Sequence, residues 1–479
     1  MNRASILAVT LLLFSLYCPL SGQVQIHPVK QVALEPIGIK YCFNNTKLMV
    51  GKSADSRHLV YFSDDTIYVV SYTNGSWQRN IAHTGKSILS ATITRYADTI
   101  WLCWKEGPLI MASYSANRGE VWSTPIPVSD AGRVSSPSVW ASQNGRICFV
   151  WSNESDAGSV ICYRSYDNGS LTDSTITISN PEDMASFPSV IAVGDTVLCT
   201  WKVGKLPSKV WFSSSFNGGV HWNEAVLTAP SLSASKDPNL AHAYDSVSGT
   251  HYVYLAYDGR NKIYFQRSTD WGVTWSDPEV ISSQSKSSQF AHIDCNHRGF
   301  VGVSYEQFPS GTSLFNDKLK DVGFTYSTNW GAPGSFGADT LAYTGNPLGS
   351  IYAALCKVSE TAFYLTWLSV DSTGGNTHVF ERNISVDYAS SINEGIYRER
   401  EITIIPNPVV DVCTVGVERG LHNATVFVYN EIGTEVIRLH DVSGLEIRLD
   451  CSDVHPGPYF IKISQAAENA LFGKFTVWR

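Results

Sequence analysis

The side chains best suited to chemistry on a polar ligand are acidic residues close to the ends of apolar strands, together with one arginine. The densest grouping is Tyr257-Asp258-Gly259-Arg260, and Tyr305-Glu306 repeats its aromatic–acidic order later in the chain. Two carboxylates can act as acid and base on a glycosidic bond, and an arginine can hold an anionic group. Charges solvated on surface loops are the structural alternative. The candidate ligand-binding residues are Glu106, Glu154, Asp237, Tyr257, Asp258, Arg260, Tyr305 and Glu306.

Other catalytic and metal-binding patterns are missing from the sequence. It contains no G-x-S-x-G nucleophile turn, no H-E-x-x-H zinc motif and no EF-hand loop. Of the ten cysteines, all but Cys18 lie beyond residue 22, and no two form a C-x-x-C pair, so a zinc site is not expected. We therefore expect no metal and no other cofactor, and we assign no catalytic residue.

Most of the candidates follow a strand that ends in an aromatic residue, and these strands belong to a repeat. The repeat is marked by the turn sequence S-x-D-x-G-x-T-W, which recurs about every 50 residues and indicates an array of similar units. The clearest copy is Ser268–Trp275, two related copies are Ser115–Trp122 and Ser215–Trp222, and weaker copies begin at Ser71, Ser165 and Ser327.

The turn sequence has a physical explanation. Gly272 can adopt a positive φ without a Cβ clash, Asp270 can accept hydrogen bonds from the N–H groups of the turn, and Trp275 can pack on the neighbouring sheet. A turn that serves every repeat is predicted to be structural. Its predicted key positions are Ser115, Asn117, Gly119, Trp122, Ser215, Asn217, Gly219, Trp222, Ser268, Asp270, Gly272 and Trp275.

Each repeat is long enough for four short antiparallel strands. In the second repeat these are predicted at 89–95, 99–104, 109–115 and 125–129. Four strands per repeat are typical of a propeller blade, so we predict an all-β propeller over residues 23–390, with seven blades preferred and six as the alternative. Val24–Leu34 is predicted to supply the fourth strand of the last blade. The candidate ligand-binding residues would then share the face opposite the repeated turns.

The repeated turn resembles the Asp box, or BNR repeat, of sialidase-like β-propellers. In that family an arginine triad holds the substrate carboxylate, its first member lies in an R-I-P motif before the first Asp box, and a Tyr–Glu pair and an Asp act on the bond. This sequence has no R-I-P motif in that region, and its nearest arginines, Arg57 and Arg79, lie in other contexts. The resemblance therefore implies the fold and carries over no catalytic residue.

The N-terminal end predicts export, and the charge balance argues against one class of partner. Residues 1–22 have a basic start and an apolar run, as in a secretory signal peptide, and no later segment is apolar over the length that a membrane span requires. The formal net charge of -8, without a basic cluster, argues against nucleic acid as a partner.

The C-terminal end reads as a second domain. Residues 391–402 are predicted to be a linker, and 403–479 a small Ig-like β-sandwich. The P-N-P start, the N-A-x-V-x-V-Y-N-x-x-G hairpin and the G-x-Y-x-I-x-I strand resemble the type A C-terminal sorting domain of the type IX secretion system. This resemblance implies the type IX machinery as a partner and a secreted or cell-surface location. A Cys413–Cys451 disulfide is an alternative to two buried thiols.

The sequence supports three functional hypotheses. The first is an exported propeller that binds extracellular glycans or proteins without sialidase catalysis. The second is a secreted glycoside hydrolase of the exo-sialidase kind. The third is a structural protein of the cell surface. Carboxylates spaced for hydrolysis would favour the second, whereas exposed aromatic rings without such a pair would favour the first.

Overall fold

The structure is a computed structural model of the whole chain. It describes residues 23–35, 39–40, 47–73, 75–180, 182–205, 207–232, 235–312, 316–337, 340–343, 349–370, 376–388, 402–430, 434–465 and 471–478. The predicted signal peptide (1–22) lies outside these ranges, as does nearly all of the predicted linker. The chain divides into two compact units, residues 1–389 and 390–479, and each is described by itself.

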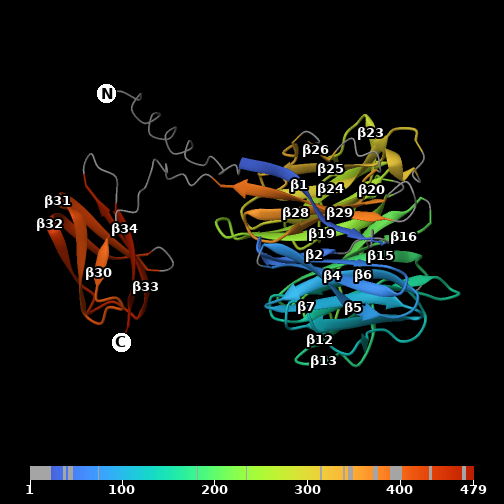
Figure 1. Cartoon of the computed structure of the whole chain (residues 1–479), viewed down its shortest axis with the longest axis horizontal. Coiled ribbons are helices and arrows are strands. Elements are labelled where there is room, and N and C mark those ends of the chain that lie inside the picture. Colours follow the sequence, from blue (N-terminus) through green and yellow to red (C-terminus); the bar gives the residue numbers. More distant parts are fainter. Residues whose placement is uncertain are drawn as a thin grey trace, which may run out of the picture. The chain divides into compact units, whose positions relative to one another are not determined.

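Within the described residues, the first unit contains seven antiparallel sheets, numbered here in chain order (Figure 1). Sheet 1 contains β2 (Met49–Ser53), β3 (Ser56–Phe62), β4 (Thr66–Thr73) and β5 (Ser76–Thr84); sheet 2 contains β6 (Ile88–Tyr96), β7 (Thr99–Glu106), β8 (Leu109–Ser115) and β9 (Ile126–Pro127). Sheet 3 contains β10 (Arg133–Ala141), β11 (Ile147–Glu154), β12 (Ser159–Asp167), β13 (Ser170–Leu171) and β14 (Ile176–Thr177); sheet 4 contains β15 (Ala185–Val193), β16 (Thr196–Val203), β17 (Lys209–Ser215) and β18 (Val226–Leu227).

The later sheets repeat this order. Sheet 5 contains β19 (Ser235–Asp245), β20 (Thr250–Gly259), β21 (Lys262–Ser268) and β22 (Glu279–Val280). Sheet 6 contains β23 (Lys286–Cys295), β24 (Val301–Pro309), β25 (Asp321–Ser327) and β26 (Thr340–Tyr343), with the 3-10 turn η1 (Asp317–Leu319) before β25. Sheet 7 contains β27 (Ile351–Lys357), β28 (Ala362–Val370), β29 (Thr377–Asp387) and β1 (Gln23–Glu35).

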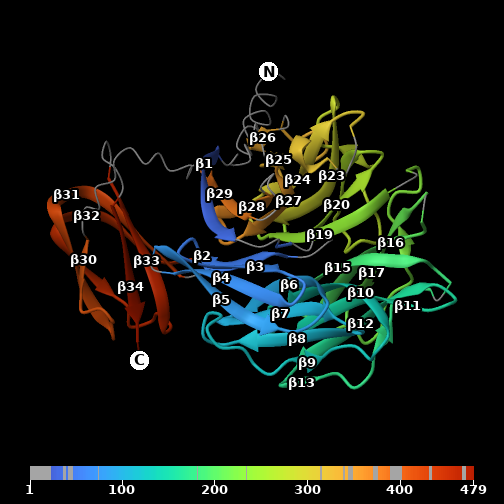
Figure 2. The ribbon, with the colours of Figure 1, turned by 45° about the vertical axis from the view of Figure 1, so that its right-hand side comes forward.

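The two ends of the first unit meet in sheet 7. Strand β1 pairs antiparallel with β29 from Gln23 opposite Asp387 to Glu35 opposite Thr377, as expected from the sequence. Figures 1 and 2 show the blue β1 beside the orange β29. The first strands of the sheets contact one another in a closed cycle, β2–β6–β10–β15–β19–β23–β27 and back to β2. We call the space that these seven strands surround the hub. This all-β arrangement is consistent with a β-propeller.

The repeated turns lie where the third strand of a sheet ends. Ser268 Oγ donates to Asp270 Oδ1 at 2.7 Å and accepts the N–H of Gly272 at 2.8 Å, and Asp270 accepts the N–H of Thr274 at 2.9 Å. The turns from Ser115 and Ser215 form the same bonds, with Asn117 and Asn217 in place of the aspartate. The sequence had indicated that the Asp or Asn side chain would accept an N–H group of the turn, whereas the serine contacts come from the structure. Both satisfy the backbone of a turn that has no strand partner.

Two turn tryptophans pack their sheets against the preceding ones. The ring of Trp275 lies 5.2 Å from that of Phe212 in sheet 4, and the ring of Trp222 lies 5.4 Å from that of Tyr163 in sheet 3. The turn glycines lie at the same contacts with positive φ, +87° for Gly272 and +88° for Gly219. A Cβ on Gly272 would lie 2.1 Å from Phe212. Glycine is therefore required there by conformation and by packing.

The second unit has its own core and one connected set of strands. These are β30 (Thr403–Ile405), β31 (Val412–Asn430), β32 (Glu435–Asp450), β33 (Gly457–Ser464) and β34 (Leu471–Val477). The long β31 pairs with both β32 and β33, and register shifts bend it. The predicted Ig-like sandwich stays a prediction. Cys413 and Cys451 are buried thiols and form no disulfide in this structure.

Candidate functional site

The first strands of five successive sheets carry the same irregularity near their beginnings. In each, the pairing with the second strand shifts register, and one residue has a φ of 50–59°. We call these five positions the bulge rim: Ser136, Phe187, Asp237, Phe290 and Tyr352. Left-handed backbone is unfavourable for bulky residues, costs about 1–3 kcal/mol and is concentrated at functional sites. Bulges of this kind also redirect side chains.

The predicted residues Asp237 and Asp258 lie at this rim and share one ammonium. Lys236 Nζ lies 2.8 Å from Asp237 Oδ2 and 3.3 Å from Asp258 Oδ2. Asp258 is buried, and it also accepts the backbone N–H of Phe290 at 2.9 Å and of Ala291 at 3.3 Å. Burial raises the pKa of Asp258 to about 7; the charge of Asp237 adds to the rise, while Lys236 opposes it. Asp258 therefore anchors the bulge of the next sheet.

Glu306 has the same role one sheet further on. Its Oε1 accepts the backbone N–H of Tyr352 at 2.7 Å, while its Oε2 accepts from Gln289 at 2.9 Å and lies 3.1 Å from Lys320 Nζ. Burial opposes the charge of Lys320, but Glu306 and Asp317 together raise the pKa of the lysine. Asp258 and Glu306, each placed after a buried tyrosine, thus hold two successive bulges.

The other predicted residues lie apart from these contacts. Tyr257 and Tyr305 are fully buried in the cores between sheets, where Tyr257 Oη donates to Gln266. Glu106 accepts from Trp104 Nε1 at 3.0 Å and lies 2.8 Å from His83 Nε2, within sheets 1 and 2. Glu154 and Arg260 are exposed, at the end of β11 and just after β20. The structure therefore brings Asp237 and Asp258 together but not the whole set.

The bulge rim holds aromatic side chains that the sequence had not indicated. Phe187, Phe290 and Tyr352 are half-buried. Lys236 Nζ lies 5.1 Å from the centre of the Phe290 ring, and Lys202 Nζ lies 5.2 Å from that of Phe187. An aromatic residue gives no local signal for left-handed backbone, so only the register shifts in the structure reveal these positions.

A pocket of about 340 Å³ lies at the other end of the first strands, where residues from all seven of them meet. The Lys47 ammonium pairs with Asp294 and lies 4.9 Å above the Trp140 ring. Although burial opposes its charge, Asp294 raises the pKa of Lys47. The pocket is lined by Lys47, Gly51, Arg95, Trp140, Ala141, Gln143, Ile191, Ala192, Val193, His242, Asp294, Cys295, His297, Lys357 and Val358.

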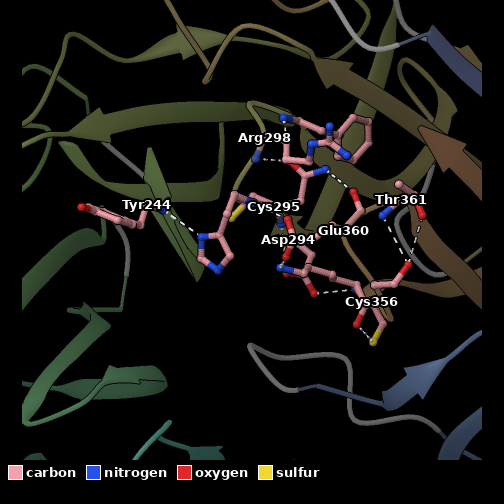
Figure 3. A network of polar contacts seen from close by, with 12 residues as sticks. Tyr244, Asp294, Cys295, Arg298, Cys356, Glu360 and Thr361 are labelled. Atoms are coloured by element: carbon pink, nitrogen blue, oxygen red, sulfur yellow. Dashed lines mark hydrogen bonds and ion pairs between the residues drawn. The ribbon is translucent and has the colours of Figure 1, made fainter. Parts of the chain in front are cut away.

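Two carboxylates beside this pocket connect sheets 6 and 7 (Figure 3). Asp294 accepts the backbone N–H of Lys357 at 2.8 Å, across the sheets. Glu360 makes a second contact between the two sheets, because it accepts the N–H of His297 at 2.7 Å. It also pairs with the Lys357 ammonium. Figure 3 shows Asp294 and Cys295 facing Glu360 and Cys356 in this network.

Three histidines and Trp271, which lies inside the Ser268–Trp275 turn, lie next to the same pocket. His242 stacks on Trp271 at 5.3 Å and on His251 at 5.3 Å, and His297 accepts the N–H of Tyr244 at 2.9 Å. Burial lowers the pKa of His242 to about 3, and the neighbouring histidines and Lys357 add to the effect. Within the described ranges, no group of three or more His, Cys, Asp or Glu side chains is placed to hold a metal ion.

Comparisons with known proteins identify the tail and find only weak similarity to solved structures for the rest. Residues 403–477 match the family described as the secretion system C-terminal sorting domain. No curated protein matches the chain. In the part of the chain that the structure describes, no helix is long and apolar enough to span a membrane. The sorting domain makes this a secreted or cell-surface protein and implies the type IX machinery as a partner.

Three solved structures illustrate the weak similarity found for the rest of the chain. A protein of unknown function from Dyadobacter fermentans is 12% identical over 75% of this chain and 99% of its own, with a TM-score of 0.41. The α-L-arabinofuranosidase Arb93A from Fusarium graminearum is 11% identical over 62% of this chain and 92% of its own, also with a TM-score of 0.41. A polysaccharide lyase, an ulvan lyase, is 8% identical over 80% and 91%, with a TM-score of 0.44. Likeness at this level says nothing of the activity of this chain.

Proposed function

We propose that this secreted protein binds an extracellular glycan at the bulge rim of a seven-bladed propeller whose repeated turns are Asp boxes. The observation that carries the proposal is the rim itself, where half-buried aromatic rings in left-handed backbone lie beside lysines and anchored carboxylates. Sugar rings have apolar C–H faces that stack on aromatic rings, and hydroxyl edges that pair with charged groups. In this proposal the tail serves delivery.

Two features of the rim favour binding over catalysis. The Asp258 carboxylate already has three hydrogen-bonding partners. Glu306 is likewise engaged by Lys320, Gln289 and Tyr352. Carboxylates that hold backbone and ammonium groups in the resting protein are poorly placed to transfer protons to a substrate.

The test is a glycan array probed with the secreted protein, followed by titration of the best ligand. Removal of a stacking ring costs about 1–2 kcal/mol, so Phe290→Ala or Tyr352→Ala should weaken binding about 5–30-fold. Tyr96→Ala, a change of an exposed ring at the far end of β6, is the matched control and should leave the affinity unchanged. Affinities that are equal in all three variants would remove the rim from the proposal.

A glycoside hydrolase is the second candidate. One observation favours it: Asp237 and Asp258 share an ammonium, and the pKa of Asp258 is raised to about 7. A carboxyl group with a pKa near 7 can act as a general acid at neutral pH. A panel of fluorogenic glycosides, sialosides included, separates the two candidates. If the protein cleaves one of these glycosides and Asp258→Asn abolishes the cleavage, the protein is a glycoside hydrolase and not only a glycan-binding protein.

A further inference from the structure

We infer that the pocket at the far end of the first strands, which we call the hub pocket, is a second binding site, separate from the bulge rim. It takes a small organic carboxylate. The pocket has a volume of about 340 Å³, within the range of small-ligand sites. Its wall combines apolar side chains with three cations: Lys47 precedes the first strand of sheet 1, Arg95 lies in sheet 2 and Lys357 lies in sheet 7.

The charges around the pocket leave one cation uncompensated. Lys47 pairs with Asp294, and Lys357 pairs with Glu360. Arg95 has no carboxylate within ion-pair distance among the described residues, and its one hydrogen bond there goes to the Ala97 carbonyl. Its remaining guanidinium N–H groups are therefore open to a ligand.

Arg146, in the same propeller, is an arginine whose charge is balanced by carboxylates. Arg146 donates to Asp167 at 3.1 Å and to Asp195 at 2.7 Å, and although burial opposes its charge, these two carboxylates raise its pKa. Burial instead lowers the pKa of Arg95, which lies half-buried at the end of β6, although Asp98, itself paired with Lys52, opposes that fall. A half-buried guanidinium without a directly paired carboxylate gains most from a ligand that brings a planar anion, since a carboxylate accepts two parallel N–H bonds.

The apolar wall selects an organic anion over a bare inorganic one. The Trp140 ring and Ile191 line the pocket beside the cations. The carboxylate Asp294 is fully engaged by Lys47 and by backbone N–H groups of Cys295 and Lys357, so it presents little free negative charge to the pocket. A ligand with one carboxylate and a compact body fits this combination of one free guanidinium and an apolar wall.

The test is calorimetric titration of the full secreted protein with D-glucuronate, beside D-glucose and the methyl ester of glucuronate as neutral probes. The acid should bind and both neutral probes should bind at least about tenfold more weakly, as expected for one charge-assisted pair. Arg95→Gln should weaken glucuronate binding about tenfold or more. Arg95→Lys should retain part of it, since the charge stays but the fork geometry is lost.

Two controls separate this site from the rim and from damage to the fold. Arg133→Gln changes an exposed arginine that pairs with Asp156 away from the pocket, and should bind glucuronate normally. Phe290→Ala, which tests the rim, should also leave glucuronate binding unchanged. Equal binding of the acid and its ester, full affinity in Arg95→Gln, or no binding of glucuronate at tens of millimolar would each overturn the inference.

Discussion

Asp258 of sheet 5 holds the backbone of Phe290 in sheet 6, because its carboxylate accepts the Phe290 N–H at 2.9 Å while that residue has a φ of 57°. The contact joins two sheets at the bulge and fixes the direction of an aromatic side chain at the rim. Glu306 repeats the arrangement with Tyr352. Residues that resemble a catalytic pair in the sequence therefore act on the backbone of their neighbours in the structure.

Asp258→Ala should destabilise the first unit and weaken glycan binding together. The change leaves the N–H groups of Phe290 and Ala291 without acceptors, which costs about 1–3 kcal/mol, and lets the strained bulge relax. Urea unfolding and ligand titration measure the two effects. Glu154→Ala, at an exposed strand end, should change neither. Normal binding by a destabilised Asp258→Ala protein would show that the bulge conformation does not matter for the ligand.

Gly272→Ala should destabilise the first unit strongly. The added Cβ would lie 2.1 Å from the Phe212 ring, and the φ of +87° is unfavourable for alanine. Overpacking and backbone strain together should cost about 2–5 kcal/mol. Gly249→Ala is the matched control in the same sheet, because its φ is +70° but nothing lies within 4 Å of the new Cβ, so only the backbone cost of about 1 kcal/mol remains. Similar losses in both variants would mean that packing at the turn contributes little.

The junction of sheets 1 and 7 depends on a buried ion pair as well as on β1. Arg57 donates to Glu381 through Nε at 3.1 Å and Nη2 at 2.7 Å, and its guanidinium lies over the Tyr72 and Tyr364 rings at 3.8 and 4.2 Å. Glu381→Gln should cost about 3–5 kcal/mol, because it leaves a buried guanidinium charge uncompensated. Asp156→Asn breaks the exposed pair with Arg133 and should leave the stability nearly unchanged. Thermal unfolding of both variants checks the contrast.

Much of the architecture could be predicted from residues that repeat. Ser268, Asp270 and Gly272 form a turn whose bonds are local, so its sequence carries its geometry, and the strands of sheet 2 end within a few residues of their predicted ends. Val24–Leu34 could be assigned to the last sheet because that sheet lacked a fourth strand. These features need only short-range patterns and the closure of a ring.

The sites could not be predicted in the same way. Arg95 and Lys357 become neighbours of one pocket only because the first strands converge on the hub, and neither lies in a repeated motif. Phe290 has left-handed backbone against its own preference, imposed by Asp258 from another sheet. Contacts between sheets set both features, and a single sequence does not display them.

Removal of the tail should stop export without unfolding the first unit. The sorting domain, matched at residues 403–477, has its own core built around side chains such as Val426 and Ile461. A chain that ends at residue 402 should therefore accumulate in the periplasm, whereas the full chain reaches the medium or the cell surface. Fractionation followed by immunoblotting measures the distribution, and protease resistance of the truncated chain checks its fold. Normal appearance of the truncated chain outside the cell would contradict the assigned role of the tail.

The first unit should lose stability in acid through His242. Its pKa in the fold is lowered to about 3, whereas an unfolded histidine has a pKa near 6.5. Because the unfolded chain binds the proton more readily, this contribution to stability is fully present above about pH 6.5 and is lost as the pH falls toward 3. His242 is only partly buried, so about 1 kcal/mol of the effect should be visible between pH 6.5 and 4.5.

His242→Phe keeps the stacking on Trp271 and should flatten this dependence, while His221→Phe, at an exposed turn position, should leave it as in the wild type. Urea unfolding followed by tryptophan fluorescence reports on the first unit, since Trp478 is the one tryptophan in the tail sequence. An unchanged slope in His242→Phe would assign the acid sensitivity to other groups.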